Sequence, residues 1–220
     1  MASNSLDVLA RVRPPVPPLL VARIAGWDAD AAPAEPRRSA SVVLIRPSAP
    51  ELEVYLLHRH SRMAFAASMV VFPGGGLDPA DTGPDPLLAC AVRETYEETG
   101  VLLAAADLWP WAHWVTPEIE PRRFDTKFYL AVLPPGQEAR DVSGETVRAD
   151  WATPSRALAA AERGGIGLMP PTLSILTELA EARTLSAVLE LAEDRVVVTV
   201  RPQVEQTADG WQFVYPQGTP

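Results

Sequence analysis

Residues 91–101, AVRETYEETGV, place three carboxylates within five positions. If this stretch is helical, a rotation of about 100° per residue puts Glu94, Glu97 and Glu98 within an arc of roughly 100°. Like charges at this spacing repel one another even in water. Two interpretations compete. The acids form either a solvated face eased by Arg93, four residues before Glu97, or a site for hard divalent cations such as Mg²⁺, which prefer oxygen ligands.

The residues upstream, VFPGGGLDPAD, favour the cation site. A short strand should end at Phe72, and Gly74, Gly75 and Gly76 let the backbone come close to a ligand or to the helix. We therefore expect Gly74 and Gly75 to contact substrate. No Gly-Lys-Ser/Thr follows, which excludes a Walker phosphate loop, and the nearby aspartates lack the spacing of an EF-hand.

A helix over residues 86–99 is predicted to carry the acids. Asp85 suits the N-cap, Pro86 the first helical position and Gly100 the position after the helix. The opposite face, which we expect to pack on a sheet, consists of Leu88, Ala89, Val92 and Tyr96.

The rest of the chain supplies the elements that position this helix. Strands are predicted over residues 39–47, 51–60, 68–72, 126–134 and 147–151. Helices are predicted over 154–163 and 171–183, each opened by proline. Residues 195–200 and 211–216 are expected to pair as late strands, and residues 1–38, rich in Pro and Ala, to form an irregular arm. This irregular mixture predicts an α/β fold, a mixed sheet with helices on its faces.

Length and composition limit the classes of function that are possible for this chain. A chain of 220 residues fits one domain, and the single Cys90 excludes an internal disulfide and a cysteine-based zinc site. No apolar run is long enough to span a membrane, and no signal peptide is evident. A net charge of −9 argues against nucleic acid as a partner, although metal ions can bridge an acidic site to a phosphorylated ligand. We expect a cytoplasmic protein, and the frequent Ala, Pro and Arg are typical of bacteria.

Together these motifs resemble the Nudix hydrolases, whose signature is Gly, five residues, Glu, seven residues, then R-E-U-x-E-E-x-G-U with U apolar. The second half matches from Arg93 onward, apart from Thr95 at an apolar position. Counted from Gly75, the Glu position falls on Asp81, with eleven residues between it and Arg93 instead of seven. Counted back from Arg93, it falls on Asp85, so the choice between the two aspartates stays open.

The resemblance implies a Nudix α/β/α sandwich and hydrolysis of a nucleoside diphosphate linked to another moiety. It is strongest over residues 39–184, with the box at 75–101, inside a domain of residues 39–220 that follows the arm at 1–38. The matched positions imply that Glu94, Glu97 and Glu98 bind Mg²⁺ or Mn²⁺. Arg93 matches the arginine that orients the glutamates, and we count Arg93 and Glu94 as catalytic.

Further candidates lie outside the box. Several Nudix enzymes place an acidic residue in a loop between strands, and Glu145 is our choice of general base there, with Glu118 and Glu120 as rivals. Arg122 and Arg123 are either surface charges or a clamp for a phosphate or carboxylate, for which a guanidinium fork is suited.

The segment VYLLHRHSRMAFAASMVVFPGG resembles the branch that includes coenzyme A diphosphatases, although Ser68 stands where the coenzyme A signature has glycine. Coenzyme A or an acyl-CoA is therefore the small-molecule substrate we favour over ADP-ribose, a dinucleotide or a nucleotide sugar. A homodimer is compatible with these features. The alternative function is a Nudix-fold nucleotide-binding or regulatory domain with little hydrolysis, suggested by the altered box spacing.

Overall fold

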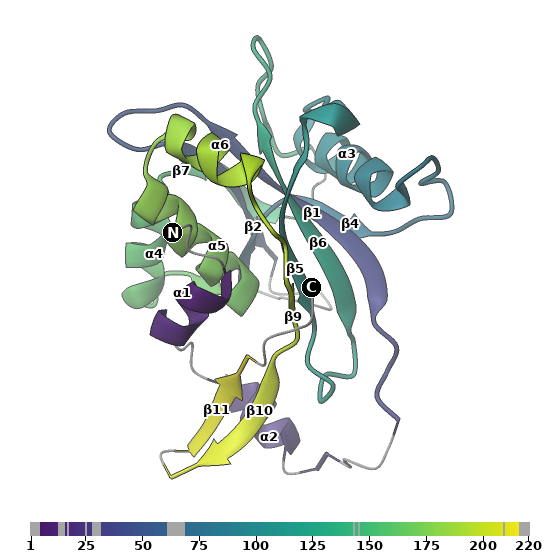
Figure 1. Cartoon of the computed structure of the whole chain (residues 1–220), viewed down its shortest axis with the longest axis vertical. Helices are drawn as coiled ribbons and strands as arrows, with labels where there is room; N and C mark the ends of the chain where they lie inside the picture. Colours follow the sequence, from purple (N-terminus) through teal and green to yellow (C-terminus); the bar gives the residue numbers. More distant parts are fainter. Residues whose placement is uncertain are drawn as a thin grey trace.

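The computed structural model describes residues 5–12, 16, 18–24, 26–27, 32–60, 69–142, 144, 146–208 and 210–215. In this part of the chain one mixed sheet runs between helices, as the sequence predicted (Figure 1). No described helix has the length and apolar character needed to cross a membrane.

Nine described strands form the sheet, in the order β8-β3-β2-β1-β6-β5-β9, with β4 also paired to β1 and β7 to β2. Their bounds are β1 Arg37–Arg46, β2 Glu53–Arg59, β3 Met69–Val71, β4 Gly74–Gly76, β5 Trp109–Val115, β6 Phe124–Val132, β7 Thr146–Ala152, β8 Gly167–Leu168 and β9 Thr199–Val200. The central strands β1 and β6 are parallel. Along β1, Val43 and Ile45 enter one core, while Val42 and Leu44 enter the other, so the strand is apolar on both faces.

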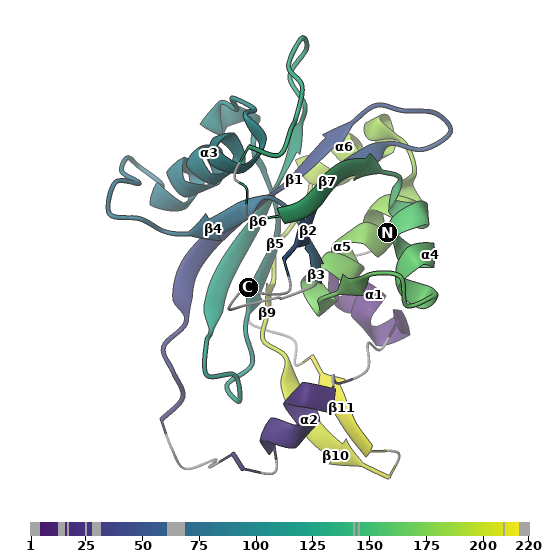
Figure 2. The same cartoon turned by 180° about the vertical axis from the view of Figure 1, so that it is seen from behind.

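Helices cover the two faces unequally (Figures 1 and 2). Helix α3 (Pro86–Thr99) packs on one face, and the short 3₁₀ helix η1 (Ala105–Asp107) follows it. The other face is covered by α1 (Ser5–Val12), α4 (Pro154–Glu162), α5 (Pro170–Ala182) and α6 (Leu185–Glu193). The candidate site therefore lies on the side of the sheet with fewer helices.

Local signals set both ends of α3, as predicted. The Asp85 carboxylate accepts a hydrogen bond from the Leu87 amide at 3.0 Å. At the other end, Gly100 adopts the left-handed conformation (φ 72°) and its amide donates to the Tyr96 carbonyl. These contacts satisfy donors and acceptors that a helix end leaves open.

The predicted sheet-facing side of α3 is correct only in part, because Leu88 and Val92 pack against the core under the helix whereas Tyr96 does not. Tyr96 is 51% exposed, whereas the buried residues of the helix are Leu87, Cys90, Ala91, Thr95, Glu98 and Thr99. The helix is therefore rotated so that its acidic side meets the sheet edge rather than open solvent. Thr95, the misfit in the box, is buried and its hydroxyl donates to the Ala91 carbonyl at 2.7 Å, which satisfies the polar group within the helix.

The terminal segments also differ from expectation. The arm predicted to be irregular contains α1 and α2 (Pro18–Ile24), and α2 packs with Ile119 against a separate hairpin of β10 (Gln203–Thr207) and β11 (Gly210–Val214). The predicted pairing of residues 195–200 with 211–216 is wrong, because β9 pairs with β5 and β11 with β10. Strand β5 and helix α6 were not predicted at all.

Candidate active site

Strand β4 brings backbone against the acidic helix. It pairs with β1, with Gly74 opposite Ser41. A Cβ added at Gly75 would lie 2.3 Å from the Glu94 carboxylate, and one at Gly74 would lie 2.4 Å from the Ala40 carbonyl oxygen. Only glycine allows both approaches, so the Gly run is needed for the close fit of β4 between β1 and α3.

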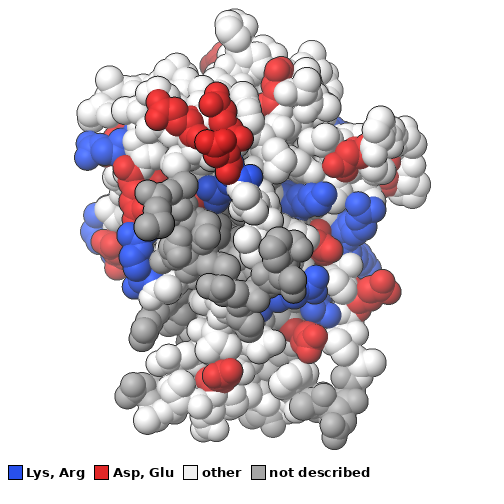
Figure 3. Space-filling model, in the orientation of Figure 1, with Lys and Arg blue, Asp and Glu red and all other residues white. Residues whose placement is uncertain are grey.

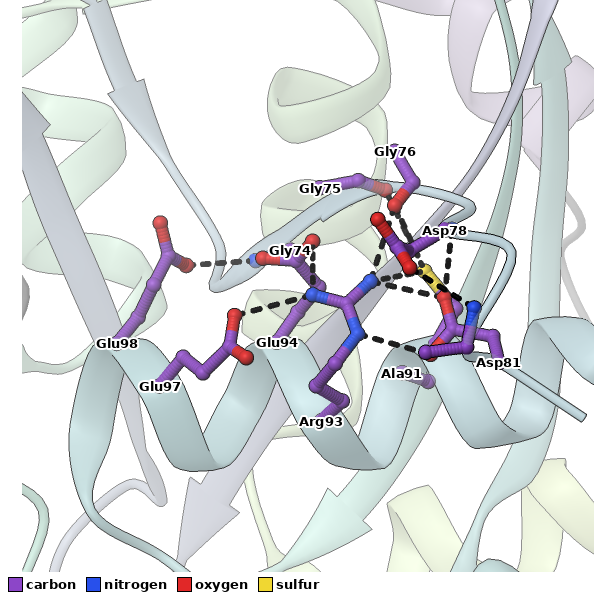
Figure 4. A network of polar contacts seen from close by, with 12 residues as sticks. Gly74, Gly75, Gly76, Asp78, Asp81, Ala91, Arg93, Glu94, Glu97 and Glu98 are labelled. Carbon is purple, nitrogen blue, oxygen red and sulfur yellow. Dashed lines mark hydrogen bonds and ion pairs between the residues drawn. The ribbon is translucent and has the colours of Figure 1, made fainter.

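The amide of Gly74 fixes one of the three glutamates. It donates to Glu98 Oε2 at 2.8 Å, and Glu98 is buried at the end of α3 (Figure 4). A hydrogen bond to a charged acceptor is stronger than one between neutral groups. The glycine loop thus orients Glu98 directly.

Arg93 lies at the centre of a network that holds the other acids (Figure 4). Its Nε and Nη2 donate to the two carboxylate oxygens of Asp81, both at 2.8 Å. Its Nη1 donates to Glu94 Oε1 at 2.8 Å and to Glu97 Oε2 at 3.0 Å. One guanidinium therefore positions two candidate metal ligands and is itself fixed by the bidentate pair with Asp81.

The two aspartates that the sequence left open have different contacts. Asp81 forms the ion pair with Arg93 and is held by the Asp78 amide at 2.8 Å, whereas Asp85 caps α3. The added loop residues therefore lie between Asp81 and the helix. The hydrogen bond from Arg93 holds the pKa of Asp81 below its usual range. The count forward from Gly75 was the sequence signal for this residue.

The three glutamates differ in their surroundings. Burial raises the pKa of Glu94 despite its bond to Arg93, while the Glu97 side chain is 55% exposed. The bond to Arg93 offsets this effect of burial only in part, and a hard cation beside Glu94 would supply further positive charge. Among the described residues, no three Asp, Glu, His or Cys side chains already form a metal-binding cluster. The donor types and the charge of the site nevertheless fit Mg²⁺ or Mn²⁺ at Glu94, Glu97 and Glu98.

Glu145, the predicted general base, lies outside the described residues. The loop that leads to it is described up to Val142, whose amide donates to the Glu98 carbonyl at 3.3 Å. The Arg140 amide likewise donates to the Thr99 carbonyl at 3.0 Å. The loop between β6 and β7 therefore contacts the end of α3 that carries Glu98 a few residues before Glu145, and the role of Glu145 stays a prediction.

Charges near the turn between β5 and β6 have structural partners. The buried Arg123 donates to the carbonyls of Thr116 and Ala34, at 3.0 and 2.8 Å. Glu120 pairs with Arg23 of α2. No contact among the described residues links Arg122 or Arg123, the predicted clamp, to α3, and Glu118 is exposed without an ion pair.

Three comparisons place this site among known proteins. The NUDIX domain family model matches residues 35–170. The Caenorhabditis elegans protein named nudix hydrolase 7 is 27% identical over 67% of this chain and 61% of its own length. The Xenopus laevis acyl-coenzyme A diphosphatase NUDT19 is 22% identical over 59% of this chain and 60% of its own length. The chain thus spans about three fifths of these relatives.

Solved structures agree on the fold. A crystal structure of a NUDIX hydrolase from Alicyclobacillus acidocaldarius superposes with a TM-score of 0.65 and 26% identity, over 72% of this chain and 97% of that one. The family model spans both the β1 region and the whole Arg93 network. The chain therefore belongs to the Nudix family and has the mixed α/β Nudix fold.

Proposed function

We propose that this chain hydrolyses a diphosphate bond in a nucleoside diphosphate linked to another moiety, and that it requires Mg²⁺ or Mn²⁺. The observation that carries the proposal is the Arg93 network, in which Asp81 fixes the arginine and the arginine fixes Glu94 and Glu97. Holding like charges together costs free energy. A cation site explains why three glutamates nevertheless lie close together on α3.

The protein's contribution is positional. A cation bound at Glu94, Glu97 and Glu98 would neutralise phosphate oxygens and make water easier to deprotonate. Arg93 and the Gly74 amide keep the glutamates in place before substrate arrives. Glu145, from the β6–β7 loop that contacts the end of α3, accepts the proton of the attacking water. Preorganised groups of this kind lower the barrier because little reorganisation is left for the reaction itself.

Coenzyme A or an acyl-CoA is the substrate class we favour. The support is the local sequence before β4 and the activity for which the Xenopus laevis relative is named, that of an acyl-coenzyme A diphosphatase. ADP-ribose, dinucleotides and nucleotide sugars share the diphosphate and are the rivals. The exposed Arg122 is a further candidate for binding an anionic group of any of them.

The proposal is tested by measuring the release of phosphorylated products from a panel of substrates in the presence of Mg²⁺. The panel contains coenzyme A, an acyl-CoA, ADP-ribose, NADH and a dinucleoside polyphosphate. We expect cation-dependent turnover of at least one, fastest with coenzyme A or its acyl derivative. Binding of a panel member without any turnover would instead support the nucleotide-binding alternative, which is motivated by an aspartate in place of the box glutamate and by the altered box spacing.

A further inference from the structure

A buried hydroxyl on β1 is bonded to the turn that leads into the glycine strand. The Ser41 hydroxyl donates to the Pro73 carbonyl oxygen at 2.8 Å and lies 3.5 Å from the Phe72 carbonyl oxygen. The Val42 amide donates to the same Pro73 oxygen, also at 2.8 Å. The backbone bond is available to any residue except proline at position 42, whereas the second bond requires a side-chain donor at position 41.

The peptide unit that Ser41 contacts also holds Glu98. The carbonyl of Pro73 and the amide of Gly74 belong to one planar trans peptide, so fixing the carbonyl also fixes the direction of the N–H. That amide donates to Glu98 Oε2 at 2.8 Å (Figure 4). Hydrogen-bonded groups in a chain polarise and strengthen one another, so bonds accepted by the carbonyl make the amide a better donor. Ser41 and Glu98 are thus linked through one rigid unit.

Ser39 is a buried hydroxyl on the same strand with a different partner. It lies two residues before Ser41 and therefore on the same face of β1. Its hydroxyl forms a hydrogen bond with the Thr126 hydroxyl of β6 at 2.7 Å, across the edge of β1 that faces away from β4. Ser39 therefore links two strands of the sheet, whereas Ser41 reaches the peptide that carries the Gly74 amide.

We propose that Ser41 is a positioning residue for the cation site. Through the Pro73–Gly74 peptide, its hydroxyl keeps the Glu98 carboxylate in the orientation that binds the cation. The inference rests on the proposed function and adds to it a residue that precedes the Nudix box. Groups that orient a metal ligand by hydrogen bonds typically change metal affinity by about 10–100-fold when they are lost. Ser41 acts one bond further from the ligand, so its effect should be smaller.

Calorimetric titration with Mn²⁺ measures this role without turnover. We expect Ser41→Ala to weaken Mn²⁺ binding by about threefold to tenfold, below the loss typical of a group bonded directly to a metal ligand. Ser41→Thr keeps a hydroxyl and should restore the wild-type affinity. The matched control is Ser39→Ala, which removes an equally buried hydroxyl from the same strand and should bind Mn²⁺ as the wild type does.

Hydrogen exchange of the Gly74 amide gives a second readout, in EDTA and without metal. We expect this amide to exchange faster in Ser41→Ala than in the wild type, because its bond to Glu98 is weakened, while amides in the interior of β1 and β6 keep their rates. In Ser39→Ala the Gly74 amide should exchange as in the wild type. Faster exchange of all these amides together would indicate a loss of overall stability and would overturn the positioning role.

Each remaining result also decides the proposal. Wild-type Mn²⁺ affinity in Ser41→Ala overturns it, and so does an equal loss of affinity in Ser39→Ala. If Ser41→Ala does not fold, as judged by its melting curve, wild-type affinity in Ser41→Cys, whose thiol is a weak donor, overturns it instead. A substrate panel without turnover would refute the proposed hydrolysis, yet the Mn²⁺ titration would still test Ser41. A wild-type chain that does not bind Mn²⁺ at millimolar concentration would overturn both the cation site and this role of Ser41.

Discussion

Helix α3, and α6 together with its C-cap residue, carry three acids at the same spacing. Helix α3 has Glu94, Glu97 and Glu98, and the end of α6 has Glu190, Glu193 and Asp194, all exposed. Acidic side chains gather visibly over α6 (Figure 3). No described residue forms an ion pair with the α6 acids, whereas on α3 one arginine and one backbone amide fix all three. The same spacing therefore comes with different contacts, because only the acids on α3 are held by other groups of the described chain.

The acids of α6 form a solvated charged face. This is the arrangement that the sequence also allowed for the acids of α3. Their neighbour Arg195 pairs instead with the buried Glu178 at 2.5 Å and stacks over Trp111. The difference lies in what faces each helix. Gly74 and Gly75 bring β4 within reach of α3, and Asp81 brings Arg93 into line.

The largest expected effect concerns the catalytic loop. We predict that Glu145→Gln lowers kcat by about 10²-fold or more with KM nearly unchanged, because a general base acts mainly in the transition state. Steady-state kinetics on the best panel substrate measures this. The same change at Glu118 or Glu120 should cost less than about tenfold. Loss of turnover in Glu120→Gln with a normal Glu145→Gln would move the base to the β5–β6 turn.

Gly75 offers a matched pair with its neighbour. We predict that Gly75→Ala lowers kcat by about tenfold or more, because its Cβ would lie 2.3 Å from the Glu94 carboxylate and displace it. Gly76→Ala is the control, since a Cβ there meets no atom within 4 Å. Equal rates for the two variants would show that the close approach of β4 is not needed for activity.

The two aspartates of the lengthened loop should differ in stability. Asp81→Asn removes the charge of a carboxylate that is only 2% exposed and bonded twice to Arg93, so we expect a loss of about 2 kcal/mol in denaturant unfolding. Asp85→Asn should change it by less than about 0.5 kcal/mol, because Asn is an equally good N-cap. A larger loss in Asp85→Asn would mean that the cap, and not the Arg93 pair, holds the loop.

The stability difference between wild type and Asp81→Asn should become smaller as the pH falls. Because the folded-state pKa of Asp81 is lowered, its contribution to stability is present above its unfolded pKa and is lost as the pH falls through the folded value. The gap between wild type and Asp81→Asn should therefore be full near pH 7 and shrink below about pH 4. Denaturant unfolding curves of both proteins near pH 7 and below about pH 4 measure this gap. A gap that widens in acid would contradict the ion pair between Asp81 and Arg93.

The smallest effect belongs to the β5–β6 turn. Arg123→Met leaves the Thr116 and Ala34 carbonyls without their donor, so we expect about 1–2 kcal/mol lower stability with kcat nearly unchanged. The exposed Arg122 provides the control, and Arg122→Met should be as stable as the wild type. A rise in KM with normal stability in Arg123→Met would instead support the phosphate clamp.

The features that could be predicted from the sequence are those that depend on residues close together in the chain. Both caps of α3 were correct, because Asp85 and Gly100 act within one turn of the helix. Most strands were found from their β-branched residues. Strand β5 was missed because WPWAHWV has one β-branched residue and contains Pro110, so its aromatic packing against the core carries the assignment instead.

What the sequence could not predict depends on tertiary contacts. The orientation of α3 follows from the place of β4, and the role of Asp81 follows from the shape of a loop longer than the family pattern. Helices α1 and α2 are short and form against α5 and the β10–β11 hairpin, which lie far away in the chain.

The most direct test of the central claim compares equivalent positions on the two acidic helices. Turnover of the best panel substrate is measured as Mg²⁺ is titrated from zero, in wild type, Glu97→Gln and Glu193→Gln. We predict no turnover in EDTA for any of the three proteins. With saturating Mg²⁺, Glu97→Gln should be slower by about 10²-fold or more, near 3 kcal/mol of barrier, while Glu193→Gln matches the wild type. Full hydrolysis in EDTA, or equal rates in Glu97→Gln and Glu193→Gln, would contradict a cation site on α3.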